Sequence, residues 1–252
     1  MAPSATLYWF DMSHPAQAAR LMLDRKGVDY RSVDLLAGFH PLLLRLAGFR
    51  GGSVPALKLD GRRLQGSLAI SRGLEELVPE PPLFPADSGA RQAVVQAESW
   101  GERELQPVPR RLNRWLLQHS HAIRRWFAAR VDMPAPGVAA VVQRPLIGAF
   151  ARISHADDPT VRADLQRLPD LLDHVDGLIG RAVIGGDQPN AADFQIGTSI
   201  WALMRFSDLT GIVEGRPAAG LADRLLPSGG DRVPAGLPPE WLPSRRAEAG
   251  RR

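Results

Sequence analysis

The hydrophobic pattern changes in kind across a proline-rich stretch, PEPPLFPADSG, at residues 79–89. Before it, short β-rich runs alternate with helical runs, whereas residues 90–226 repeat apolar positions at helical spacing almost throughout. A Pro/Gly-rich segment between two differently patterned regions is typical of an interdomain linker. We therefore predict an α/β domain over 1–78, a linker over 79–89, an all-helical domain over 90–226 and an irregular tail over 227–252.

The N-terminal region predicts the element order β-α-β-α-β-β-α. Asp60-Gly61 separates two short β-like runs, which is a strong signal for a hairpin. A parallel strand pair needs a crossover helix, so the first two strands should pair in parallel and the last two antiparallel. The expected strands are 5–10, 30–35 and the two arms of the hairpin, and the expected helices are 16–26, with Gly27 as its C-cap, 41–47 and 67–77.

The second region predicts helices near 88–118, 120–130, 137–155, 158–180, 190–207 and 216–226. Prolines inside these patterns predict kinks or breaks, because proline lacks the helical N–H donor; they are Pro107, Pro109, Pro145 and Pro169. Asn190 followed by Asp193 predicts a capping box that starts a buried helix, which is a structural role.

Composition excludes several function classes. The chain has no cysteine, so disulfides, protein thiolates and Cys-based zinc sites are ruled out, and any thiol chemistry needs a thiol from a substrate. An excess of 31 Lys+Arg over 27 Asp+Glu makes no nucleic-acid-binding stripe. The histidines lack the spacing of a metal site, and neither nucleotide-binding glycine motifs nor a hydrolase elbow is present. Without a signal peptide or a long apolar run, a cytoplasmic protein that crosses no membrane is expected.

Four segments together resemble the soluble glutathione S-transferase family over about residues 5–207: LYWFDMSHPAQAARLMLDRKGVDY, SVPALKLDG, QGSLAISRGLEEL and NAADFQIGTSIWAL. The resemblance implies an α/β thioredoxin-like N-terminal domain (βαβ-αββα) and an all-α C-terminal domain. It also implies a transferase that activates glutathione or another low-molecular-weight thiol for attack on an apolar electrophile. A homodimer follows from the resemblance only.

Ser13 is the candidate catalytic residue. It lies between the first strand and the first helix, where serine-type members of the family have a serine that donates a hydrogen bond to the bound thiolate. A free thiol has a pKa near 8.5 and is a poor nucleophile, so a hydroxyl donor beside a helix N-terminus would favour the reactive anion. Tyrosine-type members use a strand tyrosine, but Trp9 occupies that position here and Tyr8 should face the other side of the sheet. His14 is a further donor, expected to be exposed and solvated.

The candidate thiol-binding residues are Ser53, Val54, Pro55, Gly66 and Ser67. Val54-Pro55 matches the family's cis-proline strand start, which would turn the Val54 N–H and C=O outward to pair with an extended peptide. Ser67 is expected to cap the next helix and meet a carboxylate there. Two positions depart from the family: Ser53 replaces a lysine, and Gly66 replaces a Glu or Gln whose side chain contacts glutathione.

Two other hypotheses stay open from the sequence. These departures favour a non-catalytic binding or assembly protein that retains the fold. The other keeps the enzyme but changes the thiol: a composition heavy in Ala, Arg, Gly and Pro is typical of a GC-rich genome, and some organisms with such genomes use low-molecular-weight thiols other than glutathione. Arg110, Arg111 and Arg114 form a basic cluster, which we expect to be a solvated helix face rather than an anion site.

Overall fold

The computed structural model describes residues 4–35, 40–130, 135–227 and 232–243. Its N-terminal elements are β1 (Ala5–Trp9), α1 (His14–Arg25), β2 (Tyr30–Asp34), α2 (His40–Leu46), β3 (Ala56–Leu59), β4 (Arg62–Gln65) and α3 (Ser67–Leu77). The sheet order is β2-β1-β3-β4, with β1 and β2 parallel and the other neighbours antiparallel. The predicted element order, hairpin and strand directions are confirmed.

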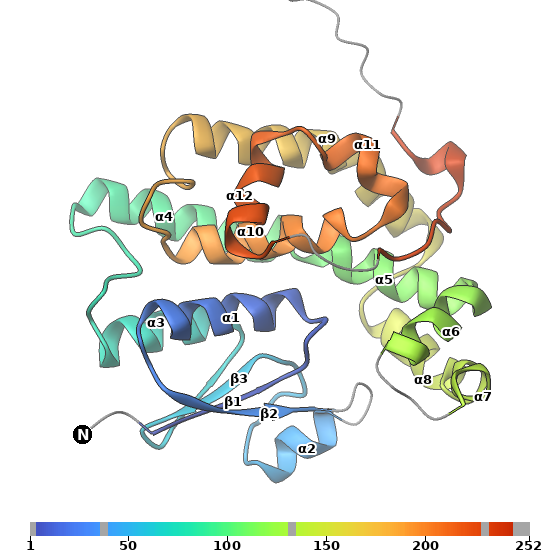
Figure 1. Cartoon of the computed structure of the whole chain (residues 1–252), viewed down its shortest axis with the longest axis horizontal. Coiled ribbons are helices and arrows are strands. Elements are labelled where there is room, and N and C mark those ends of the chain that lie inside the picture. Colours follow the sequence, from blue (N-terminus) through green and yellow to red (C-terminus); the bar gives the residue numbers. More distant parts are fainter. Residues whose placement is uncertain (1–3, 36–39, 131–134, 228–231, 244–252) are drawn as a thin grey trace, which may run out of the picture.

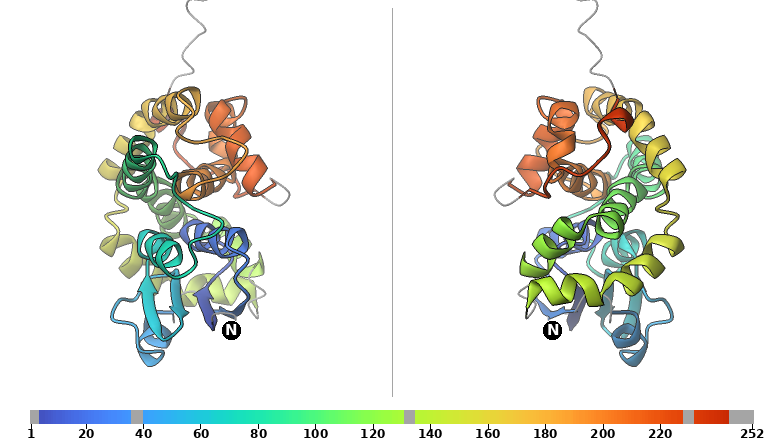
Figure 2. Two further views of the ribbon diagram at one scale, coloured as in Figure 1. Left: turned by 90° about the vertical axis from the view of Figure 1, so that its left-hand side faces the viewer. Right: turned by 90° about the vertical axis from the view of Figure 1, so that its right-hand side faces the viewer.

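Figures 1 and 2 show three layers, with α1 and α3 lying between the sheet and the helical region and α2 on the opposite face of the sheet. The main core continues from β1, β3, α1 and α3 into the helical region, because small side chains on α1 let α10 (Ala191–Met204) pack closely against it. A smaller core under α2 contains Leu35, Leu44, Phe49 and Ala56. Tyr8 packs against this smaller core and Trp9 against the main one, as strand alternation predicts.

The remaining elements are α4 (Ser88–Trp100), a π-helical turn η1 (Gly101–Leu105), α5 (Pro107–His119), α6 (His121–Arg130), α7 (Pro136–Val142), α8 (Arg144–Ile153), α9 (Asp158–Gly180), α10, η2 (Ser207–Leu209), α11 (Thr210–Val213), α12 (Pro217–Leu225) and η3 (Pro239–Trp241). The helix expected at 88–118 is interrupted by the π turn just before Pro107, and the helix expected at 137–155 is divided at Gln143. Helix α9 runs through Pro169 without ending there, so of the kink or break predicted at this proline, the break is wrong.

Local capping explains several helix ends. Asn190 Oδ1 accepts hydrogen bonds from the Ala192 and Asp193 amides, and the Asp193 carboxylate accepts from the Asn190 amide at 2.8 Å, which confirms the capping box. Helix α1 ends at Arg25 with Lys26 as C-cap, so Gly27, at φ 62°, lies one position past the cap instead of forming it as predicted. The described part of the tail is not wholly irregular, since Val233 pairs with Phe206; residues 228–231 and 244–252 lie outside the described residues.

A buried ion pair holds the segment between α3 and α4 against the N-terminal unit. Lys26 Nζ donates to Glu75 Oε2 at 2.7 Å and to the Pro79 carbonyl at 2.9 Å, and its side chain is 0% exposed. The same Glu75 oxygen accepts the Leu83 amide at 2.9 Å. Glu75, directly and through Lys26, therefore fixes the first part of the predicted linker, although the linker's role as a domain boundary stays a prediction.

Candidate functional site

The sheet register brings three separate segments to one end of the sheet. Tyr8 on β1 is opposite Ala56 on β3, and Ala56 is opposite Gln65 on β4. The turn after β1, the residues before β3 and the residues after β4 must therefore lie side by side. These are the segments that contain the predicted site residues Ser13, Ser53 to Pro55, and Gly66 with Ser67.

Ser13 occupies the N-cap position of α1, with extended backbone and a largely buried side chain. Its carbonyl accepts the Ala16 and Gln17 amides at 2.9 Å, but its hydroxyl makes no capping hydrogen bond. The helix start is thus stabilised through the backbone, and no acidic side chain lies in its first turn. The hydroxyl is left available to donate to an anion at the positive end of the helix dipole.

The Val54-Pro55 peptide bond is cis, as predicted. Among the described residues nothing pairs with the Val54 N–H or C=O, whereas the Pro55 carbonyl accepts the Gly66 amide at 2.9 Å. Gln65, which the sequence analysis missed, holds the preceding loop. Its Nε2 donates to the Ser53 carbonyl at 2.8 Å and its Oε1 accepts the Gly51 amide at 2.9 Å. The Val54 backbone groups, which are free to pair with an extended ligand, therefore lie on a loop that Gln65 holds in place.

Gly66 and Ser67 lie at the start of α3. The N-cap is Gly66, so the prediction that Ser67 caps the helix is wrong. Gly66 has φ 87°, a conformation that favours glycine, and this accounts locally for its departure from the family pattern. Ser67 is the first helical residue and is 1% exposed, and its Oγ has no hydrogen-bond partner in the part of the chain that the structure describes. A buried hydroxyl without a hydrogen-bond partner is uncommon and costs free energy. A ligand that accepts a hydrogen bond from this hydroxyl would remove that cost.

His14 is buried, so the prediction of an exposed, solvated histidine is wrong. Its Nε2 lies 3.3 Å from the Gln106 carbonyl, just ahead of α5, and Gln106 Oε1 in turn accepts from Gln195 Nε2 on α10 at 2.6 Å. Burial, with the nearby charge of Arg110, lowers the pKa of His14 to about 3. The ring is therefore neutral at physiological pH and donates to Gln106, which connects α1 to the helical region.

The arginine cluster on α5 is not the solvated face that the sequence indicated. Arg111 forms a two-pronged ion pair with Asp164 of α9, at 2.5 and 2.7 Å. Arg110 and Arg114 are half-buried and form no ion pair with any residue in the described ranges. Burial, together with the charge of Arg110, lowers the pKa of Arg114 to about 10.

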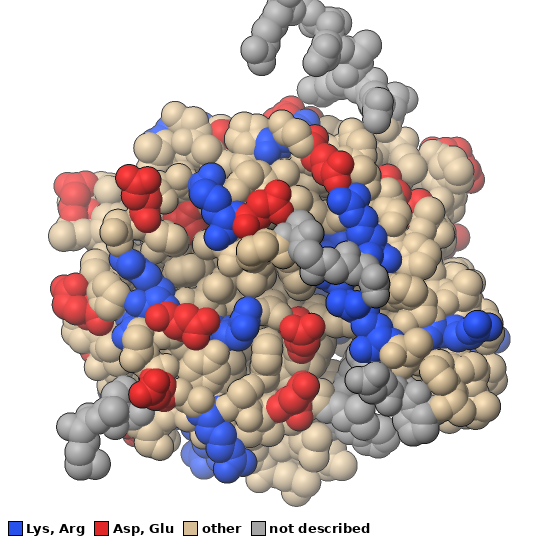
Figure 3. Space-filling view, viewed as in Figure 1, with Lys and Arg blue, Asp and Glu red and all other residues tan. Residues whose placement is uncertain are grey.

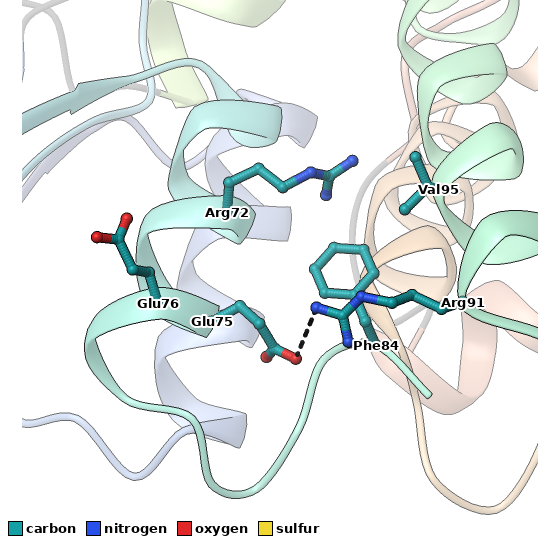
Figure 4. A pocket seen from close by; sticks show the side chains of 6 residues that line it. All are labelled: Arg72, Glu75, Glu76, Phe84, Arg91 and Val95. Atoms are coloured by element: carbon teal, nitrogen blue, oxygen red, sulfur yellow. Dashed lines mark ion pairs between the residues drawn. The ribbon is translucent and has the colours of Figure 1, made fainter. Parts of the chain in front are cut away.

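A pocket of about 250 Å³ opens between α3 and α4, and Figure 4 shows the side chains around it. Arg72 and Arg91 lie over the Phe84 ring at 4.5 and 5.3 Å, and Arg91 pairs with Glu75 at 3.8 Å. None of the predicted site residues lines this pocket. Within the described ranges, no group of three His, Asp or Glu side chains is arranged to hold a metal ion, and no helix is long and apolar enough to cross a membrane.

Comparison with known proteins identifies the family. The glutathione S-transferase N-terminal domain matches residues 7–82. Maleylacetoacetate isomerase of Rhizobium meliloti is 32% identical over 176 residues, which are 67% of this chain and 81% of the relative. This chain belongs to the glutathione S-transferase family.

Two solved structures have the same fold as this member of the glutathione S-transferase family. Maleylacetoacetate isomerase of Anaeromyxobacter dehalogenans, with bound glutathione, is 23% identical over 89% of this chain and 90% of that one, with a TM-score of 0.54. A bacterial zeta-class maleyl pyruvate isomerase is 21% identical over 87% of this chain and 90% of that one, with a TM-score of 0.59. The predicted thioredoxin-like α/β domain and helical C-terminal domain are confirmed.

Proposed function

We propose that this glutathione S-transferase binds glutathione across the Ser13, Val54 and Ser67 segments and activates its thiol for attack on an electrophilic carbon. One observation carries the proposal: three unsatisfied polar features meet at one end of the sheet. Judged on the described residues, they are the free Ser13 hydroxyl, the unpaired Val54 backbone and the buried, unpartnered Ser67 hydroxyl. A tripeptide with a thiol, two peptide groups and terminal charges supplies a partner for each.

The peptide groups of glutathione would pair with the Val54 N–H and C=O, in the manner of an added strand, on the loop that precedes β3. A carboxylate of glutathione would accept from Ser67 Oγ and lie at the N-terminus of α3, where free backbone amides and the helix dipole favour negative charge. These contacts leave the cysteine side chain of the ligand to extend toward the turn between β1 and α1.

At that turn the Ser13 hydroxyl would donate to the sulfur and favour the thiolate, whose proton passes to solvent. The sulfur lone pair then forms a carbon–sulfur bond with the electrophile. The leaving group departs with its bonding electrons, or, in an addition, the neighbouring carbon takes up a proton. Activation and positioning of the nucleophile supply most of the rate gain in this scheme.

Glutathione is favoured over another small thiol because a related family structure contains it. The non-catalytic hypothesis is not favoured, since the Rhizobium meliloti relative is an isomerase and the candidate site retains its unsatisfied groups. A homodimer and the domain boundaries at 79–89 remain predictions.

Replacement of Ser67 with alanine is expected to weaken glutathione binding by roughly ten- to a hundredfold. A hydrogen bond to a charged group contributes about 1.5–3 kcal/mol, and 1.4 kcal/mol is tenfold. The free energy of unfolding should not fall, because the hydroxyl has no partner to lose in the free protein. Calorimetric titration with glutathione measures the first effect and urea denaturation the second.

Ser88→Ala is the matched control, because Ser88 is the first residue of α4 as Ser67 is of α3, but it is exposed. It should leave glutathione binding unchanged. If wild-type protein gives no heat with glutathione, or if Ser67→Ala binds as tightly as wild type, the proposed site is wrong.

A further inference from the structure

Positive charge is concentrated in one stretch of the helical region. Between Glu104 and Asp157 the sequence has eight arginines and one acidic residue, Asp132, which lies outside the described residues. The rest of the chain has 23 basic and 26 acidic residues, of the 31 and 27 in the whole chain. The small net charge of the protein therefore combines a strongly basic segment, which forms α5 to α8, with a slightly acidic remainder.

The same segment exposes branched apolar side chains. On α7, Val138, Val141 and Val142 are 63%, 60% and 70% exposed, and their spacing of three and four residues places them on one helix face. Leu146 and Ile153, two turns apart on α8, are exposed as well. Within the described ranges, the other exposed large apolar side chains are all on α2, which contacts α8 through a stacked ring pair. A cluster of exposed apolar side chains marks a site of interaction.

Exposed arginines lie on the same helices. Arg144 and Arg152 are exposed on α8, and Arg125 and Arg130 are exposed on α6, which packs against α7. The described residues of α6, α7 and α8 include no carboxylate. Figure 1 places these helices together at the lower right, and the same corner of Figure 3 shows blue and tan side chains but no red ones among the described residues. Cations and apolar groups are thus exposed together at one corner of the molecule.

A buried arginine holds this corner together. Arg124 on α6 donates to the Ala140 carbonyl of α7 at 2.9 Å and to the Leu117 and Gln118 carbonyls of α5 at 2.7 and 2.9 Å. Because Ala140 faces inward to this contact, the valines of α7 are kept on the outside. The acceptors are carbonyls, so the guanidinium charge is not neutralised and adds to that of the exposed arginines. The positive, apolar corner is therefore a built feature of the helical region.

The combination of groups distinguishes between possible partners. A second copy that docked through the same corner would place arginines against arginines, which repel each other. A nucleic acid would supply phosphates for the arginines but no apolar surface for the valines and Ile153. The surface of an anionic bilayer supplies both, because its headgroups attract arginine and its acyl boundary accepts aliphatic side chains.

We propose that the exposed faces of α7 and α8 dock on the surface of an anionic lipid bilayer. Val138, Val141 and Val142 would enter the boundary between headgroups and acyl chains, while Arg144 and Arg152 pair with the phosphates and carboxylates of the headgroups. Such binding is peripheral and needs no membrane-spanning helix. The inference does not depend on the proposed function, since none of these residues belongs to the candidate thiol site.

The test sediments the full-length protein with vesicles of phosphatidylcholine, alone or mixed with an equal amount of phosphatidylserine. Wild type should bind the mixed vesicles at least about tenfold more tightly, and added salt should weaken that binding. Val138→Ser combined with Val142→Ser should lower the affinity by roughly tenfold or more, because it removes aliphatic side chains from the interface. Arg144→Gln combined with Arg152→Gln should have an effect of similar size, since each arginine near an anionic surface contributes roughly fivefold.

Arg31→Gln combined with Arg62→Gln is the matched control. It removes the same charge from two exposed positions at the end of the sheet away from the candidate site, and it should leave vesicle binding unchanged. Circular dichroism checks that each variant is folded. Several results would overturn the inference: no binding to the mixed vesicles, equal binding to both lipids, or a valine variant that binds as wild type does. Binding to a DNA duplex instead of vesicles, or self-association that the valine variant abolishes without any vesicle binding, would also overturn it.

Discussion

Replacing Ser13 with alanine is expected to lower kcat/KM for glutathione conjugation by roughly ten- to a hundredfold. The hydroxyl caps nothing in the free protein, so its contribution should be confined to the thiolate, where a charged hydrogen bond is worth about 1.5–3 kcal/mol. The donor favours the anion, so its loss raises the pKa of the bound thiol. The pH–rate profile should therefore shift to higher pH, and the deficit should shrink once the thiol ionises without help.

Ser13→Thr is the matched control, because it keeps a hydroxyl at the N-cap. It should recover most of the rate and return the profile toward that of wild type. Thermal unfolding should be nearly unchanged in both variants, since Ser13 supports α1 through its carbonyl. An unchanged rate and pH profile in Ser13→Ala would remove this residue from the mechanism.

Replacing Lys26 with methionine is expected to lower the free energy of unfolding by about 3–5 kcal/mol, the usual effect of removing one partner from a buried ion pair. Methionine has a similar length and preserves packing. The loss of stability therefore comes from Glu75, which would keep a nearly buried charge without its main counter-ion. The Pro79 carbonyl would also lose a donor. Because Glu75 and Lys26 together hold the segment between α3 and α4, its proteolysis should also become faster.

The adjacent residue on α3 provides the control. Glu76 pairs with Arg62 at 2.9 Å, but these side chains are 63% and 49% exposed. Arg62→Met should therefore cost less than about 1 kcal/mol, because water screens an exposed pair. Urea denaturation of the two variants in parallel measures the difference. Equal losses in the free energy of unfolding would show that burial of the Lys26–Glu75 pair adds nothing to stability.

The sequence was sufficient for the fold of the N-terminal region because its signals are local. The Asp60-Gly61 turn, the alternation of Tyr8 and Trp9 and the start of α3 each depend on a few neighbouring residues, and they fix the sheet register. That register brings Ser13, Val54 and Ser67 to one end of the sheet. The position of the candidate site could therefore be predicted without knowledge of its side-chain contacts.

The features that escaped prediction depend on contacts between distant segments. His14 is adjacent to a turn, and only the Gln106 carbonyl, 92 residues away, makes it a buried donor. The arginines of α5 repeat as on any solvated helix, and only Asp164 on α9 distinguishes Arg111 from Arg110 and Arg114, which form no ion pair within the described ranges. The free hydroxyls of Ser13 and Ser67 were likewise hidden, because serine at a helix start ordinarily caps it.

The most direct test of the central claim is the pH titration of glutathione bound to the wild-type protein, followed through the ultraviolet absorbance of the thiolate. We expect glutathione to bind and its thiol to ionise at least one pH unit below the value near 8.5 that is typical of a free thiol. Glutathione that binds but ionises at its solution value, or that does not bind at all, would contradict the assignment of this end of the sheet as a thiolate-stabilising site.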